Sequence, residues 1–256
     1  MQELKKRIGL NSYKILAYSL QGKQKLPKIN VVCEKNNIKF MIKSALNNNL
    51  FSEKIISKEY HLLRKRYNNI LNPSLLNSNT LITKYLPYPS LSYYMNNIFN
   101  KGIYVKKSIR WLVDFHNEKH RNGIGHIHGD FSAHEVIIFK NKLVIFDWED
   151  YEEKNEQLID IFYFIFRNTY QSTIIGSKEK DISKFINLLI GNKDKLHPHL
   201  KIYLKLRKNI KYNKNRRKKA FELFLKQRIK RENKYYTIPR KDRFIYREML
   251  KKLESI

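Results

Sequence analysis

The hydrophobic pattern of this chain changes period at two neighbouring prolines, and this change constrains its fold more than any other feature. Before Pro87 and Pro89, short runs rich in β-branched and aromatic residues alternate with polar stretches. Such runs predict strands: YKILAYSL, KINVVCEK, IKFMIKSA and TLITKYL. One interruption, FSEKIISKEYHLLRKRY, has apolar residues at helical spacing and predicts a helix. Proline cannot continue a sheet, so the PYPS segment predicts a connector.

Beyond the connector the helical period dominates. Apolar residues at Val105, Ile109 and Leu112 mark one face of a helix that ends before Gly123. EVIIF and KLVIF predict a hairpin that turns around Lys140–Lys142, LIDIFYFIF predicts a buried helix, and Phe221, Phe224, Leu225 and Ile229 line one face of a basic helix. We therefore expect an α+β fold with a β-rich N-terminal lobe (1–87) and a mainly helical C-terminal lobe (88–256).

The composition narrows the class of protein. The sequence of 256 residues, 42% of them hydrophobic, can bury a sizeable core. No apolar stretch reaches the roughly 18–20 residues that a transmembrane helix needs, and the N-terminus lacks the apolar core of a secretory signal. With one cysteine, Cys33, an internal disulfide framework is excluded. We expect a cytoplasmic protein, with peripheral membrane association left open by its charge.

The formal net charge of +29 predicts attraction to a polyanion: nucleic acid, an anionic membrane surface or a phosphorylated glycan. The alternative is compositional bias, because Lys, Asn and Ile are abundant while Gly and Pro are scarce. The charge is uneven, however. The stretch Lys201–Ile256 holds 21 Lys or Arg and 5 Asp or Glu, a net of +16, and includes a cluster of arginines: Arg216, Arg217, Arg228, Arg231, Arg240, Arg243 and Arg247.

Two carboxylates flank the predicted hairpin. The sequence reads HGDFSAHE before it and VIFDWE at its end, so that Asp147 follows Asp130 by 17 residues. A strand pair that begins after one acid and ends at another brings both acids to one edge.

These segments resemble the catalytic and metal-binding loops of the aminoglycoside phosphotransferase and choline kinase-like branch of the protein-kinase superfamily. That branch reads H-G-D-x-x-x-x-N and then D-[FWY]-[EG], with a short hairpin between the two. The resemblance implies a two-lobed protein-kinase-like fold, with Asp130 as the catalytic residue, His128 as support for its loop and Asp147 as a metal ligand. It spans Tyr13 to about Phe166.

Other residues follow from the same resemblance. FMIKSA resembles the strand that carries the phosphate-binding lysine, which makes Lys43 the candidate. KEYHLL resembles the helix whose glutamate holds that lysine, so Glu59 is preferred over Glu53. TKYLPYPSL resembles the hinge that binds adenine, and LIDIF contains a buried aspartate that braces the catalytic loop: Lys84, Tyr85 and Leu86 for the hinge, Asp160 for the brace.

The expected chemistry is phosphoryl transfer from ATP with Mg²⁺, which requires positioning and charge neutralisation more than covalent catalysis. Asp147 would supply a hard oxygen ligand for Mg²⁺, and Asp130 would orient or accept the proton of an attacking hydroxyl. The chain would act on a small-molecule or glycan acceptor. Because a polycationic acceptor would be repelled by the charge, a sugar or anionic glycoconjugate is preferred over an aminoglycoside.

Two departures from the family pattern leave an alternative open. Glu135 stands where the family has Asn, so it either binds a cation directly or marks a site that has lost normal nucleotide handling. The phosphate loop between the first two strands contains a single glycine, Gly22. The alternative is a pseudokinase that serves as a binding or scaffolding module through its basic C-terminal segment.

Overall fold

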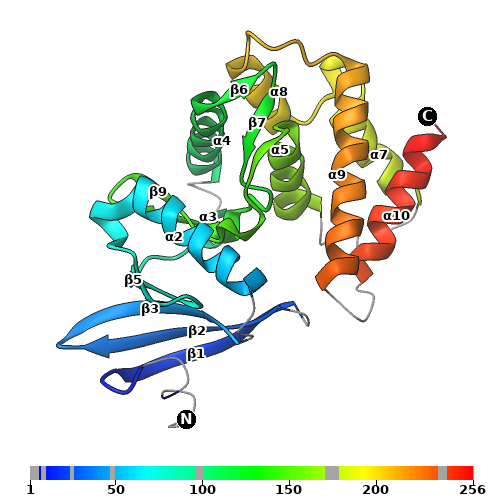
Figure 1. The fold of residues 1–256 in the computed structure, drawn as a ribbon. Helices are drawn as coiled ribbons and strands as arrows, with labels where there is room; N and C mark the ends of the chain where they lie inside the picture. Colours follow the sequence, from blue (N-terminus) through cyan, green and yellow to red (C-terminus); the bar gives the residue numbers. More distant parts are fainter. Residues whose placement is uncertain are drawn as a thin grey trace. The chain divides into compact units, whose positions relative to one another are not determined.

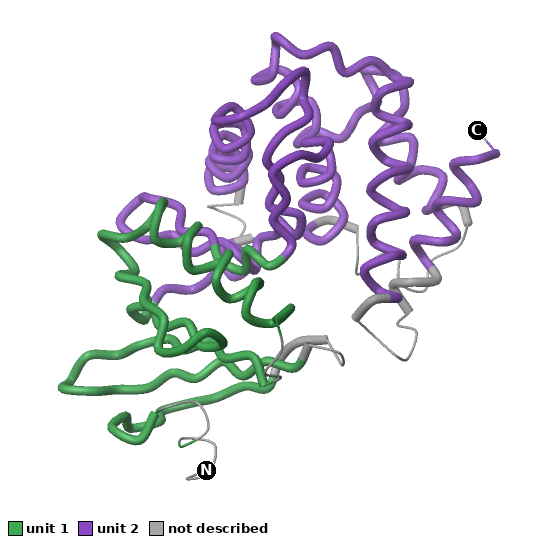
Figure 2. Tube along the Cα trace, viewed as in Figure 1, with its two compact units in different colours: residues 1–87, 146–149, 235–237 green, residues 88–145, 150–234, 238–256 purple. Residues whose placement is uncertain are grey.

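The structure, a computed structural model, describes residues 6, 10–23, 26–46, 50–95, 101–170, 179–235 and 241–255. It divides into two compact units (Figure 2). The first contains Met1–Pro87, Phe146–Glu149 and Tyr235–Thr237, and the second contains the rest. The predicted fold class is confirmed: α+β, with a β-rich N-terminal part and a mainly helical C-terminal part. The predicted division into domains 1–87 and 88–256 stays a prediction.

A five-stranded antiparallel sheet with the order β1-β2-β3-β5-β4 forms the body of the first unit (Figure 1). In β2, Ile29, Val31 and Cys33 alternate into a buried cluster that also holds Ile42 of β3. Asn36 and Asn37 have positive φ and form the tight turn between these two strands. The strands are β1 (Lys14–Lys23), β2 (Leu26–Lys35), β3 (Ile38–Ala45), β4 (Ser74–Asn77) and β5 (Thr80–Lys84).

Helix α2 (Leu50–Leu71) packs against β3 and β5 in the first unit. Its buried face repeats at helical spacing: Ser52, Ile55, Ile56, Glu59, Leu62, Leu63, Tyr67 and Leu71. A single carboxylate, Glu59, interrupts this stripe and is only 2% exposed. A buried carboxylate requires a cation or hydrogen-bond donors, so α2 brings a charge partner into the first unit.

Helices dominate the second unit. They are α3 (Leu91–Met95), α4 (Lys101–Glu118), α5 (Leu158–Ile165), α7 (Glu179–Ile190), α8 (Pro198–Leu206), α9 (Lys214–Tyr235) and α10 (Lys241–Glu254). All eight residues of α5 are buried, as its apolar sequence, interrupted only by Asp160, predicts. A π-helical turn, η3 (Phe166–Tyr170), continues α5. Aromatic contacts tie this region to the C-terminal helices, including Phe162 with Phe221 of α9 and Phe166 with Tyr246 of α10.

Short strands carry the loops of interest in the second unit. The predicted hairpin is present as β8 (Val136–Phe139) and β9 (Lys142–Ile145), and its turn residues Lys140 and Asn141 have positive φ. A three-stranded sheet, β10 (Glu152–Glu156), β7 (Ile124–Ile127) and β6 (His120–Arg121), was not expected from the sequence. The described helices include none that is long and apolar enough to cross a membrane.

Candidate functional site

Lys43 is the centre of a charged cluster in the first unit. It lies on β3 between Ile42 and Ser44, so the alternation that buries Ile42 in the core directs Lys43 to the opposite face of the sheet. Its Nζ donates hydrogen bonds to Glu59 Oε2 at 2.7 Å and to Asp147 Oδ1 at 2.8 Å. The Glu149 Oε1 atom lies 3.1 Å from the same nitrogen. The rival glutamate, Glu53, instead accepts a hydrogen bond from Ser78 Oγ.

The charge of Lys43 is strongly favoured by these contacts. Burial by itself would lower the pKa of Lys43, but the carboxylates of Asp147 and Glu59 outweigh it and raise the pKa above its ordinary value. The lysine therefore remains an ammonium group throughout the physiological range. A fixed positive charge on a rigid strand is what binding to phosphate oxygens requires.

Residues 146–149 bring Asp147 to this lysine. Trp148 is fully buried, with the Arg66 guanidinium 5.4 Å from the centre of its ring, and Lys58 Nζ donates to the carbonyl oxygen of Glu149 at 2.9 Å. Asp147 has a φ of 57°, in the left-handed region that non-glycine residues rarely adopt. Such a conformation persists only where the surroundings hold it, and the contacts of Trp148 and Glu149, the two residues that follow, do so here.

Lys28 and Glu149 belong to the cluster but were not singled out from the sequence. Lys28 lies on β2, on the face opposite Ile29, forms an ion pair with Glu149 and is 4.0 Å from Asp147 Oδ1. Glu149 is the third residue of D-W-E, so the motif contained a signal for it. For Lys28 the signal was only its strand alternation.

The donor set fits a divalent cation of the Mg²⁺ kind. Within the described part of the chain, one group of possible metal-binding side chains is found: Glu59, Asp147 and Glu149 offer carboxylate oxygens within 4.8 Å of one another. Mg²⁺ prefers such hard oxygen ligands. Two lysines accompany three carboxylates, which leaves one formal negative charge to attract a cation.

The predicted catalytic loop follows β7 in the second unit, where Asp160 holds its backbone. The carboxylate of Asp160 accepts hydrogen bonds from the backbone N–H groups of His128 and Gly129, both at 2.7 Å. Gly129 has a φ of 85°, and a Cβ at this position would overlap the carbonyl oxygen of Asp150. These contacts fix the backbone on the N-terminal side of Asp130.

A buried histidine supports Asp160 in turn. His116 Nε2 lies 3.0 Å from Asp160 Oδ2, and His116 Nδ1 lies 2.7 Å from the Tyr203 hydroxyl. Burial lowers the pKa of His116 despite the neighbouring carboxylate, which favours the neutral ring. At helical spacing His116 falls on the same face as Val105, Ile109 and Leu112, but nothing in the local sequence indicated its contact with Asp160.

Two arginines of α9 bind the same loop. Arg228 Nη2 donates to Asp130 Oδ1 at 3.1 Å and Nη1 donates to the Gly129 carbonyl oxygen at 3.3 Å. Arg231 Nη1 donates to that carbonyl at 2.7 Å, and its Nη2 lies 3.1 Å from Glu152 Oε1. The Arg228 guanidinium also lies 4.0 Å above the ring of Tyr163. The sequence identified these arginines only as part of a basic segment.

The remaining predicted residues make other contacts. Glu135 is in a short 3₁₀ turn of the second unit, η1 (Ala133–Glu135), where Ser132 Oγ donates to its Oε1 at 3.4 Å. Its role as a metal ligand stays a prediction. In the expected hinge, β5 ends at Lys84, the Tyr85 N–H donates to the Lys39 carbonyl oxygen and Leu86 is buried.

The chain resembles known proteins in structure but not in sequence. No protein-family model matches the chain, and no curated protein sequence matches it. Among solved structures, the chain is similar to the choline kinase LicA from Streptococcus pneumoniae, with a TM-score of 0.49 and 14% sequence identity over 100% of this chain and 99% of that chain.

Proposed function

We propose that this chain is an ATP- and Mg²⁺-dependent phosphotransferase that acts on a hydroxyl group of a small molecule. The observation that carries the proposal is the sharing of the Lys43 ammonium group between Glu59 of α2 and Asp147. Lys43 lies on a strand, Glu59 on a helix and Asp147 in the segment after a hairpin. These residues are far apart in the sequence but are in contact at the Lys43 ammonium group. A structural ion pair needs two partners, whereas phosphate and metal handling needs this combination of a cation with several carboxylates.

The first unit would bind the nucleotide. Lys43 would hold phosphate oxygens, with Glu59 keeping its ammonium group in place. Asp147 and Glu149 would hold Mg²⁺, which when bound neutralises charge on the phosphates. The Tyr85 N–H donates to the Lys39 carbonyl oxygen within the sheet. Successive residues of an extended strand direct their main-chain groups to opposite edges. The main-chain groups of Lys84 and Leu86 would therefore lie at the other edge, where they would meet adenine.

The second unit would supply the proton acceptor. Asp130 would orient the acceptor hydroxyl and take its proton as the bond to phosphorus forms. Asp160, through the N–H groups of His128 and Gly129, would hold the loop, and Arg228 would fix the orientation of the Asp130 carboxylate.

The acceptor would be neutral or anionic, such as a sugar or an anionic glycoconjugate. Arg228 and Arg231 are paired with carboxylates there, so the preference rests on the net charge of +29, which would repel a cationic acceptor. An acceptor carried on an anionic membrane would be compatible with a peripheral, cytoplasmic location.

Nucleotide binding and slow ATP hydrolysis, each measured with and without Mg²⁺, test the proposal. Asp147→Asn should remove the Mg²⁺-dependent part of ATP binding. Asp130→Asn should bind Mg·ATP as the wild type does but lose hydrolysis by about 100-fold or more, the contribution of a positioned base. Asp114→Asn, an exposed substitution on α4, is the control that changes one charge elsewhere.

Further variants identify the metal ligands, and the turnover of the wild type distinguishes an active kinase from a pseudokinase. If Mg²⁺ contacts Glu149, then Glu149→Gln weakens Mg·ATP binding more than Glu135→Asn does; the reverse order assigns the second ligand to Glu135. Nucleotide binding with no turnover in the wild type would favour the pseudokinase alternative. Absence of any nucleotide binding would contradict the proposal.

A further inference from the structure

A cavity of about 600 Å³ lies in the second unit, apart from the loop that holds Asp130. It is formed by α8, the segment that leads from α8 to α9, and the short turn η4 (Lys193–Lys195). The residues that line it are Lys193, Leu196, Lys201, Leu204, Lys205, Lys208, Ile210, Lys211, Tyr212, Asn213 and Arg217. Its volume is in the range that small-molecule sites occupy.

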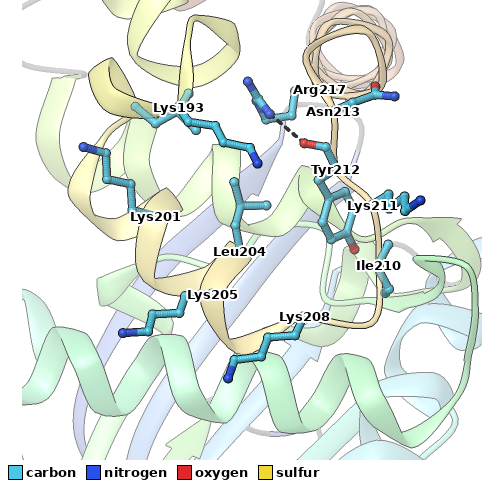
Figure 3. A pocket seen from close by; sticks show the side chains of 11 residues that line it. Lys193, Lys201, Leu204, Lys205, Lys208, Ile210, Lys211, Tyr212, Asn213 and Arg217 are labelled. Carbon is cyan, nitrogen blue, oxygen red and sulfur yellow. Dashed lines mark hydrogen bonds between the residues drawn. The ribbon is translucent and has the colours of Figure 1, made fainter.

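The lining carries six cationic side chains and no carboxylate. Figure 3 shows Leu204 in the middle of the view, with Lys193, Lys201, Lys205 and Lys208 around it. Three residues of the lining are apolar or aromatic and buried: Leu196, Ile210 and Tyr212 are at most 7% exposed. A concave surface with low-dielectric walls and charges of one sign concentrates the electrostatic field and attracts counter-ions.

Arg217 is the most informative of the six. It is 2% exposed, and its guanidinium donates to main-chain oxygens alone: Tyr212 at 2.6 Å, Gly191 at 2.7 Å and Ile190 at 3.5 Å. Within the described residues, Arg217 forms no ion pair with a carboxylate. Its charge is solvated by neutral oxygens at the end of α7 and is not cancelled, so it adds to the field of the cavity.

The lysines are also unneutralised. Lys201 Nζ donates to the main-chain oxygen of Asp194 at 2.7 Å. None of the five lysines forms an ion pair with a carboxylate in the part of the chain that the structure describes. Lys201 and Lys205 are spaced i, i+4 on α8, an arrangement of like charges that destabilises a helix. A bound polyanion would relieve this repulsion.

We propose that this cavity binds a compact polyanion that carries several phosphate groups, held by the lysines at the rim and by apolar contact with Leu204 and Ile210. This site goes beyond the proposed function and does not depend on it. The phosphates can belong to a soluble molecule or to a lipid headgroup, and both present the same chemistry to the lysines.

Binding of inositol hexakisphosphate to the full chain, measured by calorimetry at about 0.15 M salt, tests the soluble source; at that salt the Debye length is about 8 Å. Cosedimentation with phosphatidylcholine vesicles, with and without a phosphoinositide, tests the lipid source. The test variant is Lys205→Gln with Lys208→Gln. The matched control is Lys219→Gln with Lys230→Gln, which removes the same charge from exposed positions of α9 outside the cavity.

We expect the cavity pair to weaken binding of at least one probe by about tenfold, while the control pair leaves it nearly unchanged. Selective loss with inositol hexakisphosphate assigns a soluble ligand, and selective loss only with phosphoinositide vesicles assigns a headgroup. Equal losses for the two pairs, or no binding of either probe, would overturn the proposal. A single-stranded oligonucleotide is the third probe. If the cavity pair weakens its binding selectively and more strongly than that of the other two probes, the proposal is overturned in favour of nucleic acid.

Discussion

At the scale of single residues, Asp160 determines the geometry of the loop that carries Asp130. Its two oxygens accept from two consecutive backbone N–H groups, and a third contact comes from His116. Because all of these donor groups are buried, none can form a hydrogen bond with water instead if the carboxylate is lost.

We predict that Asp160→Asn lowers the free energy of unfolding by about 2–3 kcal/mol, the cost of losing a charged acceptor and leaving a buried N–H unsatisfied. An amide supplies one oxygen, and its NH₂ group would face a backbone donor. Urea unfolding measures the effect, and Asp114→Asn on exposed α4 should stay within about 0.5 kcal/mol of the wild type. A loss for Asp160→Asn as small as that of the control would contradict the bracing role.

At the scale of elements, helix α8 begins with a histidine cap. The His197 side chain accepts a hydrogen bond from the His199 N–H, an interaction that requires an unprotonated Nδ1. Burial lowers the pKa of His197 to about 4, with a smaller effect from His199. The ordinary value is 6.5, so the stabilising contribution is present above pH 6.5 and is lost as the pH falls toward 4.

We therefore predict that His197→Asn reduces the acid sensitivity of the protein. Asn keeps a capping oxygen but does not titrate in this range. Between pH 7 and pH 5 the variant should lose about 1 kcal/mol less of its unfolding free energy than the wild type, after allowance for solvent screening. Urea unfolding at the two pH values checks this. Parallel losses in variant and wild type would refute the cap as a source of pH dependence.

Helix α9 contributes a second element-scale effect, because Arg228 links it to Asp130. Arg228→Lys keeps the charge but loses the forked geometry and the stacking on Tyr163. We predict a destabilisation of about 1–2 kcal/mol, and a double-mutant cycle with Asp130→Asn should give a coupling energy of about 1 kcal/mol. The same cycle with Arg247→Lys, an exposed arginine of α10, should be additive. An additive result for Arg228 would mean that the ion pair contributes no stability in solution.

At the scale of the whole molecule, the sequence predicted what local patterns encode. The alternation in β2 and β3, the period of α2 and the apolar run of α5 determine those elements, and the D-W-E segment was recognised by its residue types. The contacts of Lys28, His116, Arg228 and Arg231 depend on tertiary packing between elements distant in sequence, so no local pattern could predict them. The arginine cluster shows this most clearly. Four of its members donate hydrogen bonds within the protein: Arg216 to Glu156, Arg217 to the Tyr212 carbonyl oxygen, Arg228 to Asp130 and Arg231 to the Gly129 carbonyl oxygen. Arg240 and the Arg243 side chain lie outside the described residues.

Because these four arginines bind groups within the protein, lysines carry most of the surface charge. A net charge of +29 on 256 residues destabilises the compact state through self-repulsion. The ion pairs of Lys43 and Arg228 are largely buried and are screened less than surface charges are. Added salt should therefore relieve repulsion more than it weakens attraction.

We predict that the melting temperature rises as NaCl increases from about 0.05 M to about 0.5 M, where the Debye length falls well below 10 Å. Differential scanning calorimetry measures the shift, and NaCl and sodium sulfate at equal ionic strength separate screening from preferential exclusion. A melting temperature that falls with NaCl would show instead that exposed ion pairs dominate the electrostatic free energy of folding.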